Sequence, residues 1–191
     1  MTYSVALVRH AQSVSPTPNG PGDYHRPLSR LGETQAMMLS DELVETEPRA
    51  IFSSPYLRAL QTIEPTAQRC NQTIRTDQRL REWDSGIEPT PDYARRYEQS
   101  WARPWWARSG AESLNELTER AVDALNATIA RAAGPPVIIG SHGTFIARAL
   151  VGFGCPGIDA AFHRAMPMPA VYRLVFSDRH VRVTGPGLCT L

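Results

Sequence analysis

The stretch Leu7-Val8-Arg9-His10-Ala11-Gln12-Ser13 decides the fold of this chain. It continues residues 3–9, which are apolar and β-branched with little polar alternation, a pattern typical of a strand buried on both faces. The predicted strand runs directly into Arg9 and His10, so an imidazole follows a fixed cation at the strand end. This pairing suits a nucleophile that attacks an anionic group.

Strand and helix patterns alternate along the rest of the chain. Strands are predicted at 50–54, 73–75 and 137–139, helices at about 29–47, 55–69, 112–132 and 144–151, and a closing hairpin at 171–176 and 180–183 around Ser177-Asp178. We therefore expect an α/β fold, a three-layer sandwich with a mostly parallel sheet and helices on both faces. In the first helix, the apolar face is predicted to carry Leu31, Met38, Leu39 and Leu43.

Two stretches interrupt this alternation. Residues 14–28 are rich in Pro and Gly and are predicted to form a loop. Residues 81–111 contain all 4 Trp residues, and a helix is expected there at 92–101. We predict a single domain over residues 1–191 with a small cap inserted at about 81–111. The aromatic residues of the cap are interpreted as packing, although an aromatic substrate is the alternative.

The charged residues exclude several kinds of chemistry. All 20 basic residues are arginine, so a Walker phosphate loop and Schiff-base chemistry, which both need a lysine, are absent. With 19 acidic residues the net charge is +1, and no basic patch for nucleic acid stands out. Any anion that binds must therefore be met by local groups.

The cysteines and apolar runs indicate a reduced, aqueous setting. Cys70, Cys155 and Cys189 are far apart and form no C-x-x-C pair, and no apolar run reaches transmembrane length. We expect a cytoplasmic protein with no targeting segment, no nucleic-acid partner and no membrane partner. A homodimer is left open.

Three predicted strand ends bring polar residues together. Arg9 and His10 follow one strand, Ser53 and Ser54 another, and Ser141 and His142 a third. Ligands bind at the carboxyl ends of the strands in such sheets, so the two histidines should meet at one site. Two histidines with convergent arginines suit phosphoryl transfer, because its transition state spreads charge over oxygens that arginine forks can bind.

Several blocks in order resemble the histidine phosphatase superfamily, the phosphoglycerate-mutase-like group. Residues 7–13 resemble its Arg-His-Gly motif, 27–36 its Pro-Leu-Thr region, 52–62 its Ser-Ser-Pro and Arg-Ala-x-Gln-Thr block, 80–86 its acidic block, 110–113 its Gly-Glu-Ser block and 140–143 its second His-Gly block. Because the blocks run in order from residue 5 to about 150, the resemblance is far more specific than a lone Arg-His pair.

The resemblance implies a role for individual residues. His10 would be the nucleophile that is phosphorylated, and Arg9, Arg58 and His142 would hold the phosphoryl group. Glu82 would be the general acid and then the base for water, with Asp84 as the alternative carboxylate. Further substrate-binding candidates are Gln12, Ser13, Arg26 and Thr144. The scheme requires no metal and no cofactor.

Two positions depart from the family pattern. Ala11 stands where the family has Gly, and its side chain would be strained if the backbone there had a positive φ. Pro16 stands where an Asn often contacts phosphate. We assign no catalytic role to His25, His163 or His180.

Other enzyme classes fit the sequence less well. A metal site built on the two motif histidines lacks local ligand spacing, and residues 140–143 do not form the G-x-S-x-G elbow of a serine hydrolase. The predicted function is a phosphomonoesterase that hydrolyses a small phosphorylated metabolite through a phosphohistidine. The alternatives are a phosphoglycerate-type phosphomutase, whose additional segments this chain lacks, and a non-catalytic binding module of the same fold.

Overall fold

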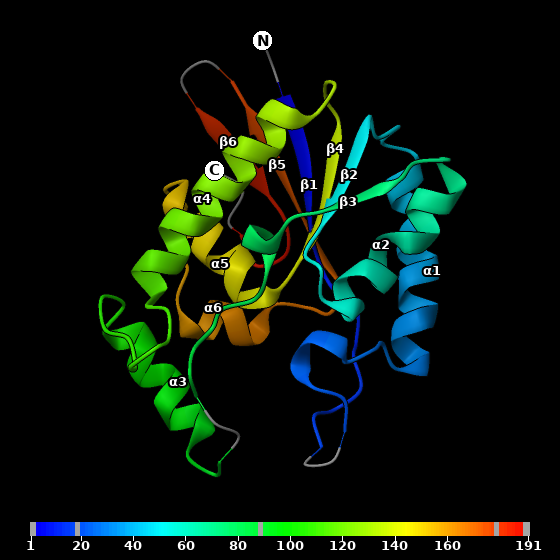
Figure 1. Cartoon of the computed structure of the whole chain (residues 1–191). Coiled ribbons are helices and arrows are strands. Elements are labelled where there is room, and N and C mark those ends of the chain that lie inside the picture. The colour runs from blue at the N-terminus through cyan, green and yellow to red at the C-terminus, as the bar shows by residue number, and fades with distance from the viewer. Residues whose placement is uncertain (1–2, 18–19, 88–89, 178–179, 189–191) are drawn as a thin grey trace.

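The computed structural model describes residues 3–17, 20–87, 90–177 and 180–188. A mixed β-sheet forms its centre (Figure 1). Its strands in the described residues are β1 Tyr3–Arg9, β2 Ala50–Ser53, β3 Ile74–Thr76, β4 Val137–Ser141, β5 Ala170–Phe176 and β6 Val181–Thr184. They pair in the order β3-β2-β4-β1-β5-β6. The first four of that order are parallel, and β5 and β6 join antiparallel. The predicted α/β class and mostly parallel sheet are confirmed.

Helices cover both faces of this sheet. They are α1 Arg30–Val44, α2 Leu57–Arg69, α3 Tyr93–Ala102, α4 Leu114–Arg131, α5 Gly143–Gly152 and α6 Ala160–Ala165, with short 3-10 helices η1 Asp23–His25 and η2 Gln78–Leu80. In Figure 1, α1 and α2 lie on one side of the sheet and α4 and α5 on the other. None of the helices in the described ranges is both long and apolar enough to span a bilayer.

The side chains of β1 alternate between the two helical layers. Val5 and Leu7 pack in the cluster that contains residues of α4 and α5, whereas Ala6 and Val8 pack in the cluster that contains residues of α1 and α2. Successive side chains of a strand point to opposite faces, so a continuous apolar run can fill both layers. This accounts for the run that precedes Arg9.

The buried face of α1 differs from the predicted one. Leu31 and Met38, two of the apolar residues of the predicted helix, are 54% and 69% exposed. The buried positions are Gly32, Ala36, Leu39, Ser40 and Leu43. Small side chains near the start of the helix let it approach the segment after His10 closely: a Cβ on Gly32 would lie 1.9 Å from the carbonyl oxygen of Gln12.

The start of α2 also differs from its predicted start. The helix begins at Leu57 rather than at Pro55, because the carbonyl of Tyr56 accepts the first helical bonds from Ala59 (2.9 Å) and Leu60 (3.1 Å). The sequence predicts neither α6 nor η1. The predicted hairpin is present as β5 and β6, although Asp178 of its turn lies outside the described residues, as does Cys189.

The loop 14–28 and the cap both extend beyond the carboxyl ends of β1, β2 and β4 (Figure 1). The cap contains α3, close to its predicted range. Of the cap aromatics, Trp83 and Tyr97 are buried in the core, as the packing interpretation predicts, but Trp105 and Trp106 are exposed. Both segments are therefore positioned above the strand ends where the motif residues lie.

Candidate active site

His10 lies just beyond the end of β1, and its backbone amide donates to the carbonyl of Ser141 (3.1 Å). Its Nδ1 is 2.7 Å from the carbonyl oxygen of Ala11. Because a carbonyl can only accept, Nδ1 carries the proton and Nε2 keeps its lone pair. Nε2 accepts from Nε of Arg58 at 3.2 Å, which agrees with this tautomer.

The surroundings of His10 keep its ring neutral. The side chain is 8% exposed. Burial and the charges of Arg58, Arg9 and Arg26 lower its pKa to about 3, against a raising effect from the Ala11 carbonyl. A neutral imidazole whose Nε2 carries no proton is the nucleophilic form.

His142 lies beside His10 because β1 and β4 are parallel, with Arg9 opposite Ser141. The two ring centroids are 5.3 Å apart. Nε2 of His142 shares a hydrogen bond of 2.7 Å with Oγ of Ser54, at the end of β2. Its Nδ1 is buried and has no partner among the described residues, and burial, Arg58 and His10 hold the pKa well below its usual value. The expected convergence of three strand ends is present.

Arg58, in the first turn of α2, is 2% exposed and faces both His10 and the loop 14–28. In addition to its bond to His10, Nη1 donates to the carbonyl of Asp23 (2.6 Å) and Nη2 to the Asp23 carboxylate (3.1 Å). Burial lowers the pKa of Arg58, and Asp23 opposes that effect. Every nitrogen of the guanidinium therefore has a partner.

Asp23, in η1, also binds Arg26. The motif blocks do not indicate Asp23 as a site residue. Nε of Arg26 donates to Oδ1 of Asp23 (3.1 Å), and Nη2 of Arg26 contacts the same oxygen. The Nη1 group donates to Oγ of Ser13 (2.8 Å) and to the carbonyl of Val14 (3.1 Å). The predicted candidates Arg26 and Ser13 are thus bonded to one another within the loop. The one sequence signal for Asp23 is its position three residues before Arg26.

Arg9 is bonded to the segment that precedes β5. Its Nη1 contacts the carbonyls of Met166 and of Pro167, the latter at 3.3 Å. Its Nε is buried without a partner among the described residues. A Cβ on Gly143 would lie 3.0 Å from that Nε, so the guanidinium passes close to the start of α5.

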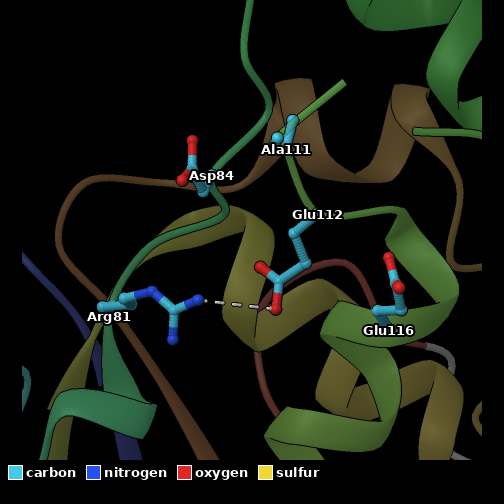
Figure 2. A pocket seen from close by; sticks show the side chains of 6 residues that line it. Arg81, Asp84, Ala111, Glu112 and Glu116 are labelled. Atoms are coloured by element: carbon cyan, nitrogen blue, oxygen red, sulfur yellow. Dashed lines mark ion pairs between the residues drawn. The ribbon is translucent and has the colours of Figure 1, made fainter. Parts of the chain in front are cut away.

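Glu82 binds the N-terminal turn of α5. Its Oε1 accepts from the amides of Trp83 (2.9 Å) and Phe145 (3.1 Å), and its Oε2 accepts from the amide of Thr144 (3.3 Å). The alternative carboxylate, Asp84, is exposed and lines a separate surface pocket of about 310 Å³ with Arg81 and Glu112 (Figure 2). Glu82 is therefore the carboxylate bonded to the first turn of α5, which directly follows His142.

A partly buried ion pair supports the Glu82 segment. Glu112 accepts from Nε (2.6 Å) and Nη2 (2.7 Å) of Arg120, on α4. Nη1 of Arg120 then donates to the carbonyls of Arg79 (2.6 Å) and Arg81 (3.0 Å). A bidentate pair of this kind fixes orientation as well as charge. Arg120 is a supporting residue that the sequence motifs do not single out.

The remaining candidates occupy different positions. Gln12 is exposed, and its side chain accepts from Oγ of Ser29 (2.7 Å), which caps α1. Thr144 is buried, and its Oγ1 lies 3.3 Å from the hydroxyl of Tyr97. The Gln12 side chain therefore contacts the start of α1.

Ala11 is accommodated without strain. It is not among the described residues with positive φ, and its methyl group packs against Leu28 and Ala36. Its amide donates to Oγ1 of Thr62 (2.9 Å), which in turn donates to the carbonyl of Arg58. The anticipated strain is therefore absent.

His163, to which the sequence assigns no catalytic role, lies near the site. Its Nδ1 is 2.9 Å from the Tyr97 hydroxyl, and burial together with Arg9 and Arg164 lowers its pKa to about 4. It connects α6 to the cap helix. Among the described residues, no group of three His, Cys, Asp or Glu side chains is arranged to hold a metal ion.

Known proteins resemble this chain in sequence and in fold. A relative from Salmonella paratyphi C, named a probable phosphoglycerate mutase, is 31% identical over 148 residues, 73% of this chain and 69% of the relative. The solved mycobacterial glucosyl-3-phosphoglycerate phosphatase matches with a TM-score of 0.72 at 23% identity, over 97% of this chain and 98% of that one. A phosphoglycerate mutase from Bacillus anthracis matches with a TM-score of 0.75 at 16% identity, over 97% and 93%. These structural matches concern the fold.

The family assignment rests on a match over nearly the whole chain. The family model for the histidine phosphatase superfamily, branch 1, matches residues 5–187, which include His10, Arg58, Glu82 and His142. Strand β1, which delivers His10, and the closing strand β6 both lie in that range. This chain belongs to branch 1 of the histidine phosphatase superfamily.

Proposed function

We propose that the protein is a phosphomonoesterase that hydrolyses a small phosphorylated metabolite through a phosphohistidine at His10. The observation that carries this proposal is the state of the His10 ring: Nδ1 donates to the Ala11 carbonyl, and Nε2 faces Nε of Arg58. A neutral nucleophile beside a buried cation can approach a dianionic phosphoryl group without charge repulsion.

In the first step, Nε2 of His10 attacks phosphorus, the P–N bond forms and the bond from phosphorus to the leaving oxygen breaks. Arg58 and the unpartnered Nδ1 of His142 bind the oxygens of the transferring group. The acid form of Glu82 gives its proton to the leaving oxygen. Its Oε2 has one amide partner, at 3.3 Å, and so has the greater capacity to hold that proton.

In the second step, the ionised Glu82 takes a proton from water as the water oxygen attacks phosphorus. The P–N bond breaks, inorganic phosphate leaves, and His10 regains its Nε2 lone pair. The partly buried Glu112–Arg120 pair holds the segment that carries Glu82 against α4 during both steps. No residue outside this set is needed to balance the protons.

A phosphomutase is the second candidate, because the curated relative is named a probable phosphoglycerate mutase. A mutase returns the phosphoryl group to the intermediate before water can take it. We favour hydrolysis, because it needs only water at the phosphohistidine, whereas a mutase must also keep its dephosphorylated intermediate in the site until the phosphoryl group returns.

The test is an assay of 4-nitrophenyl phosphate and of 3-phosphoglycerate in a buffer that contains a chelator. We expect the aryl phosphate to be hydrolysed and His10→Ala to lose activity by at least about a thousandfold. The matched control is His180→Ala, on the exposed hairpin, which should keep full activity. Formation of 2-phosphoglycerate without free phosphate would show a mutase instead, and full activity of His10→Ala would reject the nucleophile.

A further inference from the structure

The site contains an anion of its own. The Asp23 carboxylate accepts from Nη2 of Arg58 through Oδ2 (3.1 Å) and from Nε of Arg26 through Oδ1 (3.1 Å). The Asp23 side chain is 56% exposed, whereas that of Arg58 is 2% exposed. A partly solvated carboxylate therefore lies across the donors of a buried arginine.

Asp23 binds Arg58 on the side of the guanidinium that a phosphoryl group would need for a two-pronged hydrogen bond. Nε and Nη2 lie on one side of the planar guanidinium and form a two-pronged donor. Nε faces Nε2 of His10, the nucleophilic atom, and Nη2 faces Asp23. A phosphoryl group that reaches His10 and binds both prongs must therefore take the place of Oδ2.

Arg26 presents the same kind of edge to Asp23. Its Nε and Nη2 both contact Oδ1, while Nη1 is bonded to Ser13 and Val14. The Arg26 side chain thus remains held by the loop when Asp23 leaves. Two arginine edges that now share one carboxylate would then be available to phosphoryl oxygens.

We propose that Asp23 is a specificity-determining residue that occupies the donor edges of Arg58 and Arg26 in the free enzyme and is displaced only by a dianionic phosphoryl group. This inference rests on the proposed function, since it takes the phosphoryl group to bind at His10. The exposed Asp23 side chain can rotate into water, and the loop stays anchored through the amide of Val14 and the carbonyl of Pro27 (3.0 Å).

The charge balance explains the selectivity. Together Arg58, Arg26 and Asp23 carry one net positive charge, and displacement of Asp23 exposes two. A dianion neutralises both arginines, whereas a monoanion does no more than replace the carboxylate it displaces. A tethered group competes at an effective concentration on the order of millimolar, so a free monoanion at lower concentration does not displace it.

The experiment is calorimetric titration of inorganic phosphate and of dimethyl phosphate, a monoanion, at pH 8 into the wild type, Asp23→Asn and Asp23→Ala. The matched control is Asp41→Asn, which removes the same charge from a surface pair with Arg69. We expect Asp23→Asn to bind phosphate roughly tenfold more tightly and Asp41→Asn to stay within about twofold of the wild type. Dimethyl phosphate should bind both Asp23 variants detectably and the wild type not at all, because only the variants leave the donor edges of Arg58 and Arg26 free.

The outcomes separate this inference from the proposed function. Unchanged or weaker phosphate binding in the folded Asp23 variants, or dimethyl phosphate binding that is no tighter in these variants than in the wild type, overturns the role of Asp23 even if the wild type is an active phosphatase. Tighter binding with no hydrolysis by the wild type supports Asp23 and rejects the phosphatase. Circular dichroism of each variant verifies the fold, and Asp23→Ala provides the test if Asp23→Asn does not fold.

Discussion

His10 keeps one ring nitrogen for chemistry because its other nitrogen is committed to the backbone. The Ala11 carbonyl at 2.7 Å requires a donor, so the tautomer is determined by a neighbour in sequence. The position of Arg58 at the free nitrogen, in contrast, depends on a contact 48 positions away in the chain. The site therefore combines a local constraint on the nucleophile with a long-range constraint on the cation.

The Glu82→Gln variant tests the proposed role of Glu82 as the general acid. Because the amide cannot donate an acidic proton, we expect kcat to fall by roughly 10²–10⁴-fold for an alkyl phosphate. The loss should be smaller for 4-nitrophenyl phosphate, whose leaving group needs little protonation. Steady-state kinetics on both substrates checks this prediction, with Asp84→Asn as the matched control because Asp84 is exposed. Equal losses on the two substrates would contradict a role in protonating the leaving group.

The Ala11→Gly variant tests whether the family glycine is needed. Ala11 is buried, does not have a positive φ and packs with Leu28 and Ala36. Restoring glycine removes a buried methyl group and adds backbone freedom, so we expect a loss of about 1 kcal/mol in the free energy of unfolding and little change in kcat. Urea denaturation and kinetics measure both. A large gain in kcat would mean that the methyl group obstructs the site.

At the scale of elements, the carboxyl end of β1 and the start of α1 are held together by close backbone contact. The Ser29 amide donates to the Gln12 carbonyl (2.9 Å), and that same oxygen lies where a Cβ on Gly32 would be placed. The helix can pack this closely only because residue 32 has no side chain. The segment that follows His10 is thereby fixed by α1.

The Gly32→Ala variant tests that contact. The added Cβ would meet a backbone oxygen at 1.9 Å, so α1 or the Gln12 segment must move, and we expect a loss of at least about 2 kcal/mol in unfolding free energy together with reduced kcat. Gly22→Ala is the matched control, because a Cβ there meets nothing within 4 Å. Denaturation and kinetics of both variants check this. Equal stability of the two variants would argue against the contact.

Element patterns were predictable where burial on both faces made the sequence signal strong. The apolar run of β1 and the alternation of strands and helices predict the sheet. The face of α1 was not predictable from hydrophobicity, because Gly32 and Ala36 are buried for their small size while Leu31 and Met38 lie at the surface. Small residues at a close helix contact give no hydrophobic signal.

At the scale of the whole molecule, burial of histidines links stability to pH. The pKa of His10 is lowered to about 3 and that of His163 to about 4, from an ordinary value of 6.5. Between pH 4 and 6.5 the unfolded chain therefore binds more protons than the folded protein. The contribution of these histidines to the free energy of unfolding is fully present above their pKa in the unfolded chain. It falls as the pH drops from that value toward the lower pKa of the folded protein.

We expect the free energy of unfolding to decrease between pH 7 and pH 5, by up to about 1.4 kcal/mol per pH unit for each histidine that stays neutral. Urea denaturation at several pH values measures the slope. His163→Gln should show a shallower slope, because one of the buried histidines with a lowered pKa is removed. A stability that does not change over this window would contradict the neutral state of these rings.

By itself, the sequence determined the α/β class, the order of the motif blocks and the identity of His10, Arg58, Glu82 and His142 as candidates, since local apolar patterns and residue spacing carry that information. Only the tertiary structure decided that Asp23 binds Arg58, that Arg9 contacts the Met166 and Pro167 carbonyls, and that Arg120 supports the Glu82 segment. The physical reason is that these partners come from segments far apart in the chain. Their pairing depends on how loops and helices pack over the strand ends, which no local pattern encodes.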